Sequence, residues 1–255
     1  MISPAYATAA PRSRLLRLGG LRVLRVPVAA RPDGVSPAEW ESVCRINDAI
    51  VKRVRYDHAR ARSGSPGPLQ SPSEALRRGL GICMDYAALF EASARRVNLE
   101  VTSLQSTSMN HAWNAVRLGG AWWDVDVTWN AGGSLEGGAE IPEDVRSDVD
   151  FRRRYLLTTR ESEAELLQRG LIRQTHRADD TRPVDYSRTL QAMAIIARIE
   201  SLLGDAGGSR LGARASRTDA GESISRLYEQ YLRLEQAHPL AVSFRLRGRA
   251  SVRRQ

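Results

Sequence analysis

The sequence predicts a fold of the α+β class, built from helices and antiparallel strands and completed by a helical hairpin at its C-terminal end. Three patterns carry this prediction. A glycine-rich segment ends at Cys83, where an amphipathic helical run begins. Two runs rich in β-branched and aromatic residues flank Gly119-Gly120. Two long helical stripes lie near the end of the chain.

The first part of the chain predicts a basic arm and a core helix. Leu15–Val28 is β-prone. Ser36 fits a helix N-cap, and Pro37–Arg55 then carries apolar residues at helical spacing. Cys44 lies inside this helix with no glycine turn before it, so we interpret it as a core residue.

The second predicted helix begins at a cysteine. Ser63–Ser73 is rich in serine, glycine and proline, which predicts a mobile loop that could gate a cleft. Met84–Val97 has an apolar helical stripe, which places Cys83 at or just before the first turn. The free N–H groups and the helix dipole favour a thiolate there. Asp85 partly opposes this effect, and its expected role is to stabilise the helix start.

The glycine pair predicts a β-hairpin with strands at His111–Leu118 and Ala121–Trp129, after a separate strand at Glu100–Ser106. Counting from the two-residue turn places Leu118 opposite Ala121. One face is then nearly all apolar and is the expected core face. The other face carries His111, Trp113, Trp122, Asp124, Asp126 and Thr128.

This register brings an imidazole and a carboxylate together. His111 and Asp126 are diagonal neighbours, roughly 6–8 Å apart at Cβ. Asp124 shares the face but lies one strand repeat further away, so Asp126 is the better partner for the ring. A slip of one residue would bury both side chains and expose the apolar set, so the register is strongly determined.

A cysteine at a helix start, a histidine and an aspartate in this order predict a nucleophilic triad of Cys83, His111 and Asp126. Each residue alone also has a structural interpretation, as a small buried thiol, a strand histidine or a strand-capping acid. The agreement of chain order, helix start and shared strand face favours the triad. His176, in a polar segment, is interpreted as a surface loop residue.

Three segments together resemble the transglutaminase-like superfamily, in particular its microbial and kyphoscoliosis-peptidase-like members. The segments are Gly81–Ala87, His111–Val116 and Trp122–Trp129, and the resemblance covers about Trp40 to Leu157. It implies a papain-like fold in which the cysteine helix packs on an antiparallel sheet. It also implies Cys83 as nucleophile, His111 as general base and acid, and Asp126 as the carboxylate that orients the ring.

The oxyanion donors depart from the papain pattern. Papain-type enzymes carry a glutamine six residues before the cysteine, and this chain has Arg77 there. The backbone N–H of Cys83 could supply one donor. Trp40 and Tyr56 are candidates for a second donor, in place of the tryptophan that animal transglutaminases use, and the sequence leaves this donor unassigned.

Two tryptophans are candidates for substrate binding. Trp113 and Trp122 share the predicted face of His111 and could line an acyl-binding groove. The equally favoured alternative is that they pack beneath the loop near residue 130.

The predicted chemistry is attack of a thiolate on an amide carbonyl to form a thioester. We expect a cysteine peptidase or amidohydrolase that acts on a protein or peptide. The alternatives are an acyl transferase that passes the acyl group to an amine, and a non-catalytic scaffold that keeps the fold. No cofactor is expected. The acidic segment 131–150 follows no metal-loop spacing, so no metal is expected either.

The chain divides into a basic arm at 1–34, a transglutaminase-like core at 35–186 and a helical extension with a basic tail at 187–255. A strand at Tyr155–Thr158 and a helix at Ser162–Arg169 complete the core. In the extension, helical stripes at Thr189–Leu203 and Glu222–Glu235 predict a hairpin of helices.

The net charge of +9 comes almost entirely from arginine, since Lys52 is the only lysine. The arginines are scattered through the chain, so we expect no nucleic-acid binding, although the basic ends could contact an acidic partner. No apolar run reaches the ~20 residues of a membrane span, and no secretory signal is seen. Two cysteines with separate roles fit a reducing, cytoplasmic location.

Overall fold

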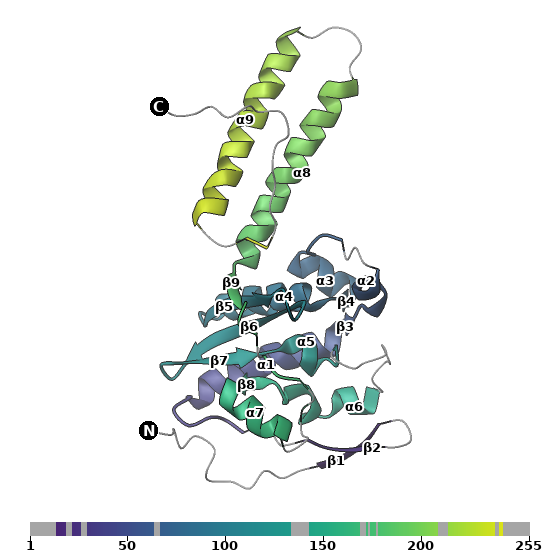
Figure 1. Ribbon diagram of the computed structural model, residues 1–255, viewed down its shortest axis with the longest axis vertical. Helices are drawn as coiled ribbons and strands as arrows, with labels where there is room; N and C mark the ends of the chain where they lie inside the picture. Colours follow the sequence, from purple (N-terminus) through teal and green to yellow (C-terminus); the bar gives the residue numbers. More distant parts are fainter. Residues whose placement is uncertain are drawn as a thin grey trace. The chain divides into compact units, whose positions relative to one another are not determined.

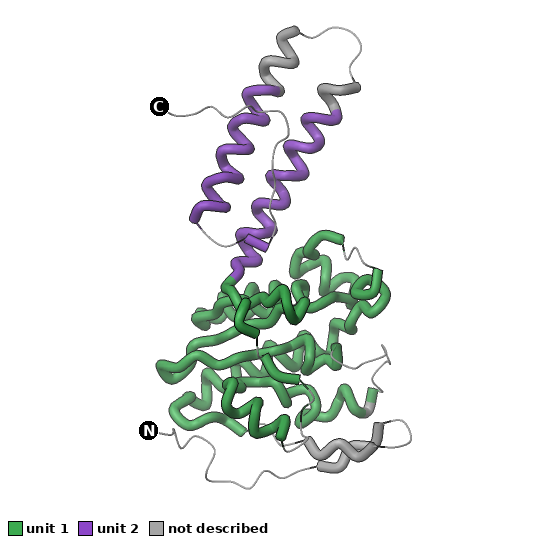
Figure 2. The backbone as a smooth tube through the Cα atoms, viewed as in Figure 1, with its two compact units in different colours: residues 1–183 green, residues 184–255 purple. Residues whose placement is uncertain are grey.

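The chain forms two compact units, residues 1–183 and residues 184–255 (Figure 2). The computed structural model describes residues 14–18, 22–26, 30–63, 67–133, 143–168, 172, 174–176, 178–208, 214–237 and 240–241. None of the described helices is both long and apolar enough to cross a lipid bilayer. The three-part division predicted from sequence remains a prediction beside these two units.

The first unit is built on a five-stranded sheet, which makes the fold α+β as expected (Figure 1). The strand order is β8-β7-β6-β5-β9, and the pairs β5–β6, β6–β7 and β7–β8 are antiparallel. The strands are β5 (Glu100–Ser106), β6 (His111–Leu118), β7 (Ala121–Val125), β8 (Leu156–Thr158) and β9 (Arg182–Val184).

The predicted register of the central hairpin is confirmed. Leu118 pairs with Ala121 across the glycine turn, and the pairing continues to Asn114 opposite Val125. Both turn glycines have positive φ, 55° at Gly119 and 82° at Gly120, as the tight two-residue turn requires.

The second strand of this hairpin ends four residues earlier than predicted. Strand β7 stops at Val125, and Asp126 is the N-cap of a short helix, α5 (Val127–Asn130). The Asp126 carboxylate accepts the backbone N–H of Trp129 at 2.8 Å. The expectation that Asp126 and Thr128 continue the strand was therefore wrong, because aspartate is a strong N-cap and starts a helix there.

Two helices of the first unit enclose the main core. Helix α1 (Pro37–Arg53) starts at a capping box formed by Ser36 and Glu39, and helix α4 (Cys83–Arg96) starts at the nucleophile candidate. Cys44 is 3% exposed and belongs to this core, as expected. Buried residues of the core come from both helices and from the sheet: Val43, Ile50, Val51, Tyr86, Leu89, Phe90, Val116, Leu118 and Val125.

A buried polar network fixes α4 against the sheet. Glu91 on α4 is fully buried and accepts a short hydrogen bond from the Ser103 hydroxyl of β5. Asn114 on β6 donates to Ser103 Oγ at 2.9 Å and to the carbonyl of Ala87 on α4 at 3.1 Å. Because buried polar groups must be paired, these contacts hold the helix in one position on the strands.

Smaller elements complete the first unit. They are β1 (Arg14–Leu18) and β2 (Arg22–Val26), which pair as an antiparallel hairpin in the predicted arm, β3 (Arg55–Tyr56) and β4 (Leu80–Gly81), which pair in parallel, and the helices α2 (His58–Arg62), α3 (Pro72–Arg78), α6 (Glu143–Ser147), η2 (Phe151–Arg153) and α7 (Arg160–Gln168). The acidic segment 131–150 contains helix α6, in which Val145 and Arg146 are buried.

The second unit is the predicted helical hairpin. Helices α8 (Tyr186–Gly208) and α9 (Arg214–Ala237) pack against each other, and both are longer than their apolar stripes indicated. The basic C-terminal tail and residues 1–13 lie outside the described residues.

Candidate active site

Cys83 is the first residue of α4 and is partly exposed. Ile82 before it is extended, with φ −105° and ψ 178°, so the chain turns into the helix at the cysteine. At this position the N–H of Cys83 is one of the helix's first N–H groups, which have no intrahelical partner. Gly81 leaves room for the close turn, because a Cβ there would approach Asp85 Cβ to 3.2 Å, a tight contact.

Asp85 anchors this helix start. Its carboxylate accepts the N–H of Ile82 at 2.9 Å, the N–H of Gln70 at 2.8 Å and the side-chain amide of Gln70 at 3.0 Å. It also pairs with Arg60. Asp85 therefore stabilises the helix start, as expected, and also holds the segment around residue 70 against α4.

The predicted loop before the cysteine is less extensive than expected. Its last two residues, Pro72 and Ser73, already belong to α3, and Gln70 is buried and bound to Asp85. Residues 64–66 of the predicted loop lie outside the described residues. That this segment gates a cleft remains a prediction.

The side chains of Cys83, His111 and Asp126 meet. His111 opens β6, and its Nε2 lies 2.6 Å from Asp126 Oδ2. The Cys83 side chain lies close enough to His111 to raise the pKa of the ring, and Nδ1 is the ring nitrogen that Asp126 does not contact. Trp129 of α5 stacks on the ring at 4.6 Å between centroids and an interplanar angle of 6°.

The environment of His111 favours its imidazolium form. Burial lowers the pKa of His111, but the charge and hydrogen bond of Asp126 and the contact with Cys83 outweigh burial and raise the pKa to about 10. Burial raises the pKa of Asp126, and the charge and hydrogen bonds of the two nearby imidazoles reverse this and hold the pKa well below its usual range. The site therefore holds a carboxylate beside a protonated ring.

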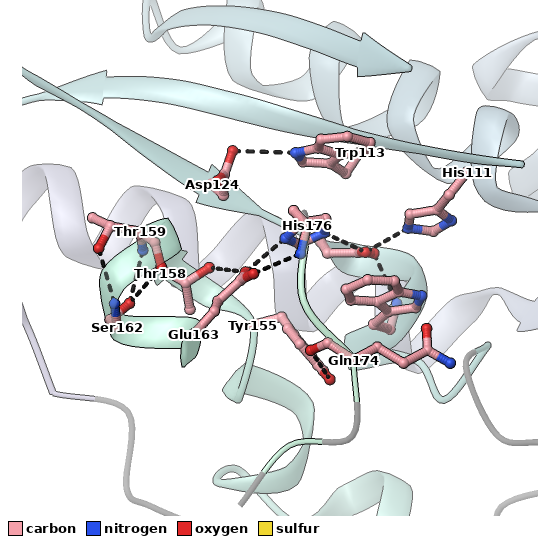
Figure 3. A network of polar contacts seen from close by, with 12 residues as sticks. His111, Trp113, Asp124, Tyr155, Thr158, Thr159, Ser162, Glu163, Gln174 and His176 are labelled. Carbon is pink, nitrogen blue, oxygen red and sulfur yellow. Dashed lines mark hydrogen bonds and ion pairs between the residues drawn. The ribbon is translucent and has the colours of Figure 1, made fainter. Parts of the chain in front are cut away.

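His176 is not the surface residue that the sequence suggested. It is 1% exposed, and its Nε2 lies 3.0 Å from Asp126 Oδ2 (Figure 3). Its Nδ1 lies 2.6 Å from Glu163 Oε1 on α7. The prediction failed because His176 lies in a polar segment without helical or strand periodicity, so no local signal in the sequence indicates that it is buried.

The candidate substrate tryptophans lie in different places. Trp113 is 2% exposed, and its indole N–H donates to Asp124 at 3.1 Å beside His176 (Figure 3). Trp122 is 47% exposed and pairs with Arg117, six residues along β6 from His111, or roughly 20 Å at 3.3 Å per residue. The structure therefore brings Trp113 to the site, as part of its packed wall, and leaves Trp122 away from it.

The two side-chain candidates for the second oxyanion donor, Trp40 and Tyr56, also lie in different places. Trp40 is near the start of α1, whereas the far end of α1 reaches the nucleophile helix, since Val54 accepts the hydroxyl of Tyr86 at 2.8 Å. Val54 follows Trp40 by 14 positions, a rise of roughly 21 Å along the helix, which excludes Trp40 from the site. Tyr56 instead pairs with Gly81, two residues before Cys83.

Tyr56 keeps its proton in this position. Burial raises the pKa of its hydroxyl, and the nearby negative charges of Cys83 and Asp126 raise it further. A phenol with a raised pKa remains a hydrogen-bond donor at every physiological pH.

Two groups of side chains in the described part of the chain have the residue types of a metal site. They are His111, Asp126 and His176, and Asp124, Glu163 and His176, with ligand atoms within 4.8 Å of one another. Two of these contacts are already 2.6 Å long, which is shorter than the ~3.3 Å between ligands of a tetrahedral zinc ion. The atoms are therefore arranged as hydrogen-bonded pairs.

Comparison with known proteins finds a family match over the part of the chain that contains this site. A family model described as the Transglutaminase-like superfamily matches residues 28–127, which include Cys83, His111 and Asp126. This part of the chain is therefore similar to the transglutaminase-like superfamily. The match, together with the meeting of a thiol, an imidazole and a carboxylate, supports a cysteine-type enzyme.

Two individual proteins are similar to part of this chain. Kyphoscoliosis peptidase of Homo sapiens is 31% identical over 97 residues, which cover 32% of this chain and 14% of the relative, so the chain spans about a seventh of that protein. The crystal structure of a candidate cysteine protease from Cytophaga hutchinsonii is 26% identical, with a TM-score of 0.29, and covers 35% of this chain and 31% of that chain.

Proposed function

We propose that this protein is a cysteine-nucleophile enzyme that cleaves amide bonds of peptides through a thioester intermediate. The observation that carries the proposal is the position of His111, which contacts Asp126 and lies close enough to Cys83 for that side chain to raise its pKa. In this proposal Cys83 is the nucleophile, His111 is the general base and acid, and Asp126 orients the ring.

In the first half of the reaction, the thiolate of Cys83 attacks the carbonyl carbon and a C–S bond forms. The tetrahedral intermediate collapses as the C–N bond breaks, and the imidazolium of His111 gives its proton to the leaving amine. The raised pKa of His111 supports this role, because the ring carries the proton that the amine needs.

In the second half, the neutral His111 takes a proton from a water molecule that attacks the thioester. The C–S bond breaks, a carboxylic acid leaves and the sulfur departs as a thiolate, while His111 keeps the proton from water and the thiolate–imidazolium pair is restored. Partial exposure of Cys83 supports access of both peptide and water.

We assign the oxyanion donors to the backbone N–H of Cys83 and the hydroxyl of Tyr56. The first is a free donor at a helix N-terminus, and the second is a protonated phenol close enough for its pKa to respond to the charge of Cys83. Tyr56→Phe removes only the hydroxyl. We expect kcat to fall by about 10²-fold, the typical effect of removing one oxyanion donor, while alkylation of Cys83 is retained.

The same thioester could pass its acyl group to a primary amine, which is the transferase reaction favoured by the family match. Addition of a primary amine to an enzyme turning over an acyl substrate separates the two reactions. Formation of an amide product supports the transferase, and its complete absence leaves the hydrolase.

The name of the human relative favours a peptide substrate. An acidic partner for the basic ends and a cytoplasmic location remain predictions.

Alkylation by iodoacetamide tests the nucleophile directly. We expect Cys83 to react well below pH 8, and His111→Ala to slow this reaction. Cys44 is an internal control, because burial raises the pKa of its thiol to about 11, and it should stay unlabelled in the folded protein. Equal, slow labelling of both thiols would instead indicate a scaffold without an activated cysteine.

A further inference from the structure

A second histidine and a second carboxylate stand directly behind the candidate triad. His176 and Glu163 both lie beyond residue 127, where the family match ends. His176 is 1% exposed and Glu163 is fully buried, and Figure 3 shows His176 between Glu163 and His111. Hydrogen-bonding contacts run without a break from His111 through Asp126 and His176 to Glu163 on α7.

The hydrogen bonds define the proton content of His176. Glu163 accepts three bonds, from the Thr158 hydroxyl at 2.8 Å, the backbone N–H of His176 at 2.7 Å and its Nδ1 at 2.6 Å. Asp126 accepts the backbone N–H of Trp129 and contacts both imidazoles. With both carboxylates ionised, the two ring nitrogens of His176 are the donors, and the ring is an imidazolium between two carboxylates, as its raised pKa indicates.

Stacking prevents this ring from turning. Trp129 lies 4.4 Å from the His176 ring at an interplanar angle of 16°, and Trp113 lies 4.7 Å from it at 25°. A cation over indole faces is stabilised electrostatically, more strongly where water is excluded. The ring of His176 is therefore held in plane and in direction before any substrate binds.

We propose that His176, clamped by Glu163, is a positioning residue that holds Asp126 in the orientation needed to align His111 with Cys83. Together with the three residues of the triad, His176 and Glu163 form a row of five neighbouring side chains, of which the triad is the outer part. This inference rests on the proposed function for its effect on turnover, whereas the clamp itself can be measured without any substrate.

The clamp depends on the proton of His176. The titratable groups that face this ring are Asp126 from α5, Glu163 from α7, Asp124 from β7, His111 from β6 and Tyr155 before β8. Burial lowers the pKa of His176, but the hydrogen bonds and charges of Asp126 and Glu163 raise it to about 9. A neutral ring has a single N–H, so above this pH it can no longer donate to both carboxylates.

The test is the rate of Cys83 alkylation by iodoacetamide, measured from about pH 6 to about pH 10.5 in a Cys44→Ser background. At pH 7 we expect His176→Gln to react roughly tenfold more slowly, the factor that corresponds to one hydrogen bond. The difference should close above about pH 9, because the wild-type ring then loses the same proton. In Glu163→Gln the change in alkylation rate that wild type shows near pH 9 should move toward neutral pH, because the carboxylate that helps His176 to keep its proton is gone.

Thr158→Val is the matched control, because it removes one hydrogen bond from Glu163 without a change of charge. Its pH profile should keep the wild-type shape. A rate ratio between wild type and His176→Gln that is constant at every pH would overturn the proposal, since it indicates packing alone. Equal rates would also overturn it. Wild-type Cys83 that reacts no faster than an exposed thiol would overturn the proposed function instead, so the two failures are distinguishable.

Discussion

Replacement of Asp126 by asparagine should cost stability and reactivity together. Asp126 is fully buried, caps α5 and contacts both imidazoles with one oxygen, at 2.6 Å and 3.0 Å. Asparagine is also a good N-cap, so its oxygen can still accept the N–H of Trp129. Its NH₂ group then faces two N–H donors, and the buried rings lose their counter-charge.

The expected loss follows from this geometry. Removing one partner of a buried ion pair typically costs about 3–5 kcal/mol of unfolding free energy, and we expect Asp126→Asn to fall in this range near pH 7. Because His111 loses its orienting partner, alkylation of Cys83 should slow by at least about tenfold.

Urea denaturation followed by tryptophan fluorescence measures the first effect. All five tryptophans lie in the first unit, so the signal reports on the unit that contains the site. Glu100→Gln is a suitable control, since its partner Arg117 is exposed and 3.4 Å away, and such pairs contribute about 0–1 kcal/mol. A loss in Asp126→Asn no larger than in this control, with unchanged alkylation, would refute the assignment of Asp126.

Three further outcomes are expected. The contribution of His111 to the unfolding free energy of the first unit should be largest below about pH 6.5 and fall by about 1.4 kcal/mol per pH unit as pH rises toward 10. The reason is that the folded ring keeps a proton over this range that the unfolded ring loses. A denaturation midpoint that rises over this range would contradict the prediction. Asp85→Asn should lower the unfolding free energy in urea by about 2–4 kcal/mol and slow the alkylation of Cys83, since Asp85 anchors the helix start. Unchanged stability together with unchanged alkylation would exclude this role. Gly119→Ala should lower the thermal midpoint more than Gly120→Ala. A Cβ at residue 119 would lie 2.2 Å from the backbone oxygen of Gly34, whereas a Cβ at residue 120 would meet nothing within 4 Å. Equal midpoints would contradict this close approach.

The sequence predicts well where short-range periodicity sets the structure. The hairpin register is confirmed because a two-residue glycine turn and strict alternation leave one arrangement that buries the apolar face. The helix that begins at Cys83 is confirmed for a similar reason. The extension of the strand through Asp126 failed, because its N-cap preference competes with the β-propensity of the residues that follow.

Long-range contacts are the part that sequence periodicity does not contain. His176 reaches Asp126 across 50 residues of chain, and nothing in its flanking residues marks it as buried. Trp40 was a candidate on residue type alone, and the length of α1 carries it away from Cys83. In both cases the deciding quantity is a tertiary distance.

The hydrogen bond from the backbone N–H of Asp126 to the carbonyl of Tyr155 has a practical consequence. A fragment cut where the family match ends, at residue 127, would lack this acceptor as well as the inner walls supplied by Glu163 and His176. Its aspartate would face water, and a truncated product would be a poor reagent for purification or crystallisation. Expression should therefore extend at least through residue 183, where the first compact unit ends.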